Sequence, residues 1–145
     1  MKGLRTHLPK LLVVGIILGG VGLLVSNMLA PSREQGGTPE LRLPDLSRTA
    51  AAGKRAFDAN CAECHGANGT GTDKGPPLIH RIYNPGHHAD EAFFRAIQNG
   101  VRRHHWNFGD MPPQPKVTEK QAEEIIAYVR EIQVANGIRW EEHRM

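Results

Sequence analysis

The chain has two cysteines, Cys61 and Cys64, and a histidine, His65, follows the second directly. A C-x-x-C-H run is the attachment site of a c-type haem. Two thiols at this spacing can add to the two vinyl groups of one porphyrin, and the adjacent imidazole can bind the iron. The run therefore predicts one covalently bound haem c, with His65 as its proximal ligand.

Three other chemistries use closely spaced cysteines. A thioredoxin-like redox pair would require a βαβ context, and no such pattern surrounds the motif. A structural zinc site needs four ligands and usually a second cysteine pair, which the chain lacks. A structural disulfide remains an alternative, but it would leave His65 without a role.

Two helices are predicted in the region between residues 49 and 99. The first covers residues 49–60, with Ser47 or Thr49 as its N-cap, and leads directly into the cysteine motif. The second covers residues 90–99, with Gly100 just past its end.

The third predicted helix has the clearest signals. Thr118 and Gln121 form a capping box, and Gly137 ends the segment. Apolar residues follow one helical face at Ala122, Ile125, Ile126, Val129 and Ile132. Since no segment alternates over strand length, we expect an all-α domain of three to four short helices. About 100 residues make only a thin core, so a buried haem would supply apolar surface for the helices to pack on.

The N-terminus predicts a membrane anchor. Lys2, Arg5 and Lys10 precede residues 11–30, which carry no charged side chain. This length matches the roughly 20 residues needed to cross a bilayer. A cleavable signal peptide is the alternative, because it also combines a basic start with an apolar run. Either interpretation keeps the N-terminus in the cytoplasm and sends residues 31–145 across the membrane. We favour the uncleaved anchor, which predicts a single-pass protein of a bacterial inner membrane with the haem domain on the periplasmic side.

The predicted organisation has three parts. Residues 1–30 form the basic segment and the transmembrane helix, residues 31–48 a linker rich in Pro, Gly and charge, and residues 49–145 the domain that binds haem. The formal net charge of +3 arises entirely from Lys2, Arg5 and Lys10, so the remainder of the chain is neutral. Nucleic-acid binding is therefore not expected.

The chain resembles a class I c-type cytochrome over roughly residues 48–137. Gly53 and Phe57 precede the cysteine motif where that family has a small and an aromatic residue on its first helix. Ile125 and Tyr128 are similar to the matching pair on its last helix. The resemblance implies that these two helices cross closely at the glycine.

Residues 75–78 are similar to the family's G-P-x-L segment. The resemblance implies that Gly75, Pro76 and Leu78 contribute to the haem site. Pro76 would accept a hydrogen bond from the second ring nitrogen of His65 through its carbonyl, and Leu78 would cover the porphyrin.

The resemblance also implies a methionine as the second axial ligand. Met1, Met28 and Met145 lie at the N-terminus, in the apolar run and at the last position, which leaves Met111. Met111 lies in a Gly- and Pro-rich loop before the last helix, as in the family's distal methionine loop.

Five histidines lie between the proximal and the distal ligand: His80, His87, His88, His104 and His105. They can be ordinary loop residues, one of which bonds a haem propionate. Alternatively, His104 or His105 replaces Met111 on the iron, or the group forms a secondary copper or zinc site.

Together these features predict a membrane-tethered monohaem electron carrier that cycles between Fe(III) and Fe(II) with His/Met ligation. Its partners would be redox proteins met in transient contacts, with no small-molecule substrate and no catalytic residues. Two other functions remain open: a haem c subunit of a larger respiratory oxidoreductase, and a haem-based gas or redox sensor.

Overall fold

The computed structural model describes residues 40–142 and, in the N-terminal part, Gly19, Gly20 and Gly22. The chain divides into two units, Met1–Glu40 and Leu41–Met145. Apart from the three glycines, the predicted membrane segment at 11–30 lies outside the described residues. Among the described residues, no helix combines the length and the hydropathy that a membrane span requires.

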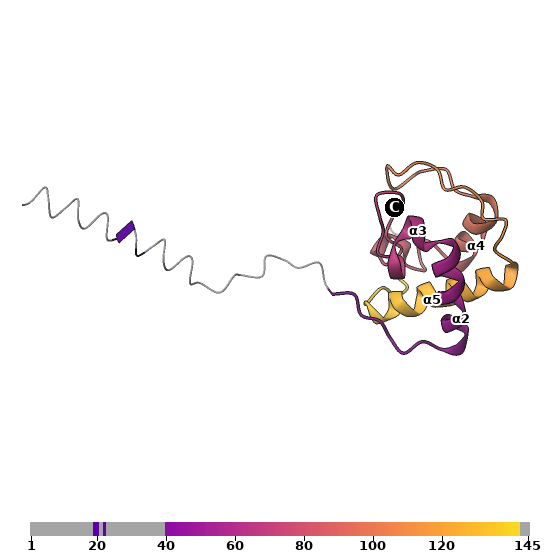
Figure 1. Cartoon of the computed structure of the whole chain (residues 1–145), viewed down its shortest axis with the longest axis horizontal. Coiled ribbons are helices and arrows are strands. Elements are labelled where there is room, and N and C mark those ends of the chain that lie inside the picture. Colours follow the sequence, from indigo (N-terminus) through magenta and orange to yellow (C-terminus); the bar gives the residue numbers. More distant parts are fainter. Residues whose placement is uncertain (1–18, 21, 23–39, 143–145) are drawn as a thin grey trace, which may run out of the picture. The chain divides into compact units, whose positions relative to one another are not determined.

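The second unit is built from helices joined by long loops (Figure 1). Its described part contains α2 (Arg48–Asn60), α3 (Ala62–His65), α4 (Asp90–Asn99) and α5 (Glu119–Ala135), with short 3-10 helices η1 (Ala67–Gly69) and η2 (Arg81–Tyr83). The three predicted helices are confirmed as α2, α4 and α5, and α3 was not predicted. The prediction of a mostly helical fold is confirmed as well.

The capping residues predicted from the sequence begin α2 and α5 and end α4. The hydroxyl of Ser47 accepts a hydrogen bond from the backbone N–H of Ala50, which caps α2. Thr118 and Gln121 form a complete capping box at the start of α5. Gly100 ends α4 in a conformation with a φ of 75°.

Helices α2 and α5 make the largest contact between elements of the domain. A Cβ atom at Gly53 would overlap the backbone carbonyl of Glu124, so only glycine permits this crossing. One turn later Phe57 packs on Tyr128, with ring centroids 5.4 Å apart. The close crossing that the resemblance implied is therefore confirmed.

The core lies mainly on one face of α5. Its buried members are the predicted apolar stripe together with Tyr128 and Gln133. Leu41 and Leu46, which the sequence analysis places in the linker, pack against this core. The side chain of Asn136 also hydrogen-bonds both backbone polar groups of Arg42, which fastens the start of the unit to the end of α5.

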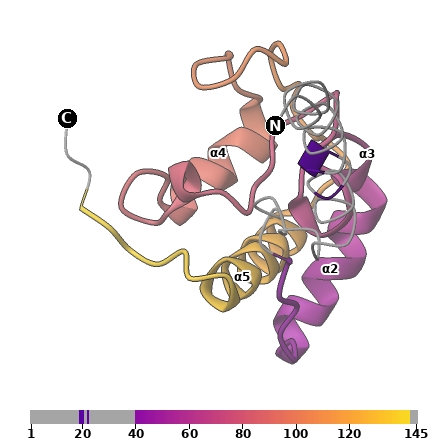
Figure 2. The same cartoon turned by 90° about the vertical axis from the view of Figure 1, so that its left-hand side faces the viewer.

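Helix α4 contacts α5 on a different side from α2, as Figure 2 shows with α5 seen nearly end-on. Two long loops flank α4, one between η1 and α4 and one between α4 and α5. In the second loop Val101 and Met111 form an isolated antiparallel bridge. This bridge is the only β-type pairing between described residues, which contain no strand.

Candidate functional site

A cavity of about 360 Å³ opens among the helices and the two long loops. Side chains from α2, α4 and α5 line it, together with residues of the loops at 76–78 and 100–111. Most of its lining is apolar, and representative residues are Phe57, Leu78, Phe93, Ile97, Ile125 and Val129. A large flat apolar group therefore fits the chemistry of this site.

The cysteine motif lies where α2 ends and α3 begins. The carbonyl of Cys61 accepts hydrogen bonds from the backbone N–H groups of Cys64 (3.1 Å) and His65 (2.9 Å), which winds the motif into one helical turn. Cys61 lines the cavity, whereas Cys64 is exposed.

The state of Cys61 does not fit a redox-active cysteine pair. Burial, together with the neighbouring Cys64, raises the pKa of Cys61 to about 11. A redox-active C-x-x-C pair instead requires a thiol pKa below the usual value. Cys61 and Cys64 are free thiols. The raised pKa of Cys61 argues against a redox-active pair.

His65 is held in one orientation by residues downstream. Its Nδ1 atom lies 2.9 Å from the carbonyl oxygen of Pro76. Because a carbonyl can only accept, Nδ1 carries the proton and Nε2 keeps its lone pair. Burial lowers the pKa of His65, against an opposing effect of the Pro76 hydrogen bond, so the neutral imidazole is favoured. A neutral ring with a lone pair on Nε2 is the form that binds iron.

The segment at 75–78 reaches the motif because its first residue is glycine. A Cβ atom at Gly75 would lie 2.9 Å from the carbonyl oxygen of Cys64, which is closer than such contacts normally are. Backbone hydrogen bonds fix the other end of the segment. The N–H of Leu78 donates to Gly69 at 2.7 Å, and the Leu78 carbonyl accepts from the buried amide of Gln133 at 2.9 Å.

Met111 is held in the loop before α5. It exchanges two backbone hydrogen bonds with Val101, both 2.9 Å long. The next part of the loop is tied to α4, because the N–H of Gln114 donates to the carbonyl of Ile97 at 2.7 Å. The Met111 side chain lines the cavity together with His65.

The structure therefore brings the predicted site residues together. Cys61, His65, Pro76, Leu78 and Met111 all line the cavity. Cys64 stays exposed on α3, and Gly75 packs on its backbone. A pair of thiols, a neutral imidazole and a thioether around an apolar cavity form a donor set that fits a covalently attached haem.

A polar pair in the cavity lining was not predicted from the sequence. The indole N–H of Trp106 donates to the hydroxyl of Tyr83 at 3.1 Å, and both residues line the cavity. Burial raises the pKa of Tyr83, so its hydroxyl stays protonated and can donate in turn. Tryptophan and tyrosine each occur only twice in the chain, which was the one available signal.

Comparison with known protein families matches residues 50–133, more than half of the chain, to the family described as Cytochrome c. The chain belongs to the cytochrome c family. Cytochromes c carry haem c covalently, and Cys61 and Cys64 have the spacing of the attachment motif. Membership of this family fits an electron-transfer protein.

One solved structure with a similar fold is the c-type cytochrome XoxG from Methylobacterium extorquens AM1. The two sequences are 19% identical, and the TM-score is 0.49. The match covers 68% of this chain and 61% of XoxG, so it spans about three fifths of that protein's length. The search of curated proteins finds no match.

Proposed function

We propose that this cytochrome c is a membrane-tethered, periplasmic electron carrier with one haem and His65/Met111 ligation. The observation that supports the proposal best is the pairing of two donors in one cavity. The imidazole of His65 has its lone pair on Nε2, and the thioether of Met111 lies in the same lining.

Each residue has a defined part in this proposal. Cys61 and Cys64 would anchor the porphyrin, and Leu78 would cover it. Pro76 fixes the ring of His65 and raises its basicity through the hydrogen bond from Nδ1. The bound haem supplies one-electron chemistry between Fe(III) and Fe(II), at a potential raised by a methionine ligand.

The proposed ligand pair argues for a carrier and against a sensor. A gas sensor needs an open position on the iron, or a ligand that leaves easily. Met111 is held by two backbone hydrogen bonds to Val101 and by the Gln114 bond to α4, so its loop is restrained at both sides. A restrained loop would keep its side chain in place.

The N-terminal sequence supports the tether. Lys2, Arg5 and Lys10 precede a charge-free run long enough to span a bilayer, and this charge pattern would direct the haem domain to the periplasm. A tether would raise the effective concentration of the domain near membrane-bound redox partners.

A redox-titrated visible spectrum of the detergent-extracted protein tests the proposal. We expect one reversible one-electron transition and no change of the reduced spectrum when carbon monoxide is added at neutral pH. A rapid spectral change with carbon monoxide would contradict the carrier function and favour a sensor.

Extraction from the membrane tests the tether and the free-carrier function. The protein should leave the membrane fraction only with detergent, and its intact mass should include residues 11–30. Release by osmotic shock would contradict the tether. Co-purification of stoichiometric catalytic subunits in mild detergent would contradict the free carrier. It would instead identify the protein as a subunit of a larger oxidoreductase.

A further inference from the structure

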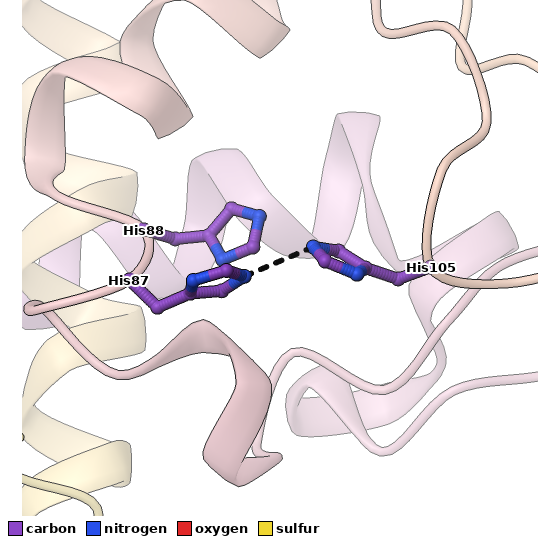
Figure 3. A group of neighbouring side chains, drawn as sticks. All are labelled: His87, His88 and His105. Carbon is purple, nitrogen blue, oxygen red and sulfur yellow. Dashed lines mark hydrogen bonds between the residues drawn. The ribbon is translucent and has the colours of Figure 1, made fainter. Parts of the chain in front are cut away.

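Three histidines from two separate loops converge at the edge of the cavity, and two of them, His88 and His105, line it. His87 and His88 lie in the loop between η2 and α4, and His105 lies in the loop between α4 and α5 (Figure 3). One ring nitrogen from each lies within 4.8 Å of the others. We propose that this group, the histidine cluster, binds one divalent transition-metal ion of the copper and zinc type.

The spacing of two of the rings is already that of metal ligands. The Nε2 atoms of His87 and His105 lie 3.2 Å apart and face each other in Figure 3. Two nitrogens bound to one tetrahedral zinc ion, each about 2.05 Å from the metal, are separated by roughly 3.3 Å. A metal ion between the two rings would therefore require little movement of either side chain.

The third ring is oriented by a backbone contact. The Nδ1 atom of His88 lies 2.8 Å from the carbonyl oxygen of Ile82. The carbonyl accepts, so Nδ1 carries the proton and Nε2 holds the lone pair. Histidines that bind metals commonly donate their other N–H to a backbone carbonyl or a carboxylate in this way.

The loop that carries His87 and His88 is fixed by α5. The backbone N–H groups of both residues donate to the carbonyl of Asn84, at 3.0 and 2.8 Å. The guanidinium of Arg130 donates to the carbonyls of His88 and Tyr83 and pairs with Asp90. The backbone positions of His87 and His88 are therefore set by the fold before any metal binds, which favours affinity.

The composition of the cluster selects the metal. Imidazole nitrogen suits copper and zinc, whereas magnesium, calcium and manganese prefer oxygen ligands. The cluster itself contains no carboxylate. Three protein ligands also leave a further coordination position, as in zinc sites that hold a water molecule or a substrate.

Adjacent histidines can share this site because the backbone there is irregular. His87 and His88 lie between η2 and α4, and their ring centroids are 4.6 Å apart. In a strand the two side chains would point to opposite faces. The secondary metal site that the sequence suggested thus has a defined set of residues. It includes neither of the proposed iron ligands, His65 and Met111.

The test uses the full-length holocytochrome in detergent, freed of metal with a chelator. Copper(II) and zinc(II), each alone, are titrated against a competing chromogenic chelator. We expect one ion per chain for the wild type and at least about 10-fold to 100-fold weaker binding for His87→Gln and for His105→Gln. His80→Gln is the matched control and should bind like the wild type. Its side chain caps η2 instead of joining the cluster.

Two further readouts keep the test decisive. The electron paramagnetic resonance spectrum of the copper(II) form should show coupling to several imidazole nitrogens. The visible spectrum of each variant reports folding and iron ligation, and His105 is an exposed loop residue whose replacement should preserve both. Equal affinity in the wild type and the His87→Gln/His105→Gln double variant would overturn the proposal. A His105→Gln or His88→Gln variant with altered iron ligation would also overturn it, because that residue would then belong to the haem.

Discussion

Val101 and Met111 are bound to each other through two backbone hydrogen bonds of 2.9 Å across a loop of nine residues, 102–110. The bridge closes the loop that contains His104, His105 and Trp106, and the Met111 side chain lines the same cavity as His65. The position of the proposed distal ligand is therefore determined by backbone pairing at the end of α4.

Met111→Ala tests the proposed sulfur ligand. The variant should lose the weak far-red absorption band of the ferric protein that marks sulfur–iron ligation. Its midpoint potential should also fall, because a thioether favours ferrous iron. His105→Ala is the control and should keep both properties. Loss of the band in His105→Ala, with retention in Met111→Ala, would assign the iron ligand to the histidine.

Gly53→Ala tests the crossing of α2 and α5. In a solvent-exposed helix this change stabilises the fold by up to about 1 kcal/mol. Here the added methyl would overlap the Glu124 carbonyl, so we expect a loss of about 1–3 kcal/mol in the free energy of unfolding. Denaturant unfolding of the ferric holoprotein measures the change. A more stable variant would show that the helices do not meet at this glycine.

Gly75→Ala tests how the segment at 75–78 acts on His65. A Cβ atom beside the Cys64 carbonyl would push this segment away and weaken the hydrogen bond from His65 to Pro76. A weaker bond makes the imidazole less basic, which disfavours the ferric state, so the midpoint potential should rise. A redox titration measures it.

The matched control for Gly75→Ala is Lys74→Ala. Lys74 is exposed and pairs with the exposed Glu63, so its removal should leave the potential unchanged. Equal midpoint potentials in the wild type and in Gly75→Ala would show that the segment at 75–78 does not tune the potential through His65.

Arg130→Met tests the contacts that α5 makes with the loop before α4. The side chain is largely buried and donates to two backbone carbonyls, to Gln133 and to Asp90. Hydrogen bonds from a charged group contribute about 1.5–3 kcal/mol each, and unpaired carbonyls add a cost. We expect a loss of about 2–4 kcal/mol in the free energy of unfolding. The exposed Lys120→Met, in the same helix, should change it by less than about 0.5 kcal/mol.

The sequence predicts the helices of this fold well because their signals are local. The capping box at Thr118, the cap at Ser47 and Gly100 act within a few residues, so they can be read without knowledge of the partner. The cysteine motif is a local signal too, because the C-x-x-C-H spacing is set by the porphyrin that it binds.

The remaining features depend on contacts between distant residues. The Val101–Met111 bridge, the Trp106–Tyr83 hydrogen bond and the convergence of the histidine cluster each join residues that lie outside the α-helices. No periodicity marks such loops. Their geometry could therefore be anticipated only as an excess of histidine and aromatic residues between the two proposed iron ligands.

The covalent attachment of one haem to Cys61 and Cys64 is tested most directly by the intact mass of the protein. After expression in a host with a cytochrome c maturation system, the denatured wild type should carry the mass of one haem. The Cys61→Ala/Cys64→Ala variant should carry none and should accumulate poorly, since its core lacks the porphyrin. A wild-type mass equal to that of the bare polypeptide, or normal coloured protein from the double variant, would contradict the account.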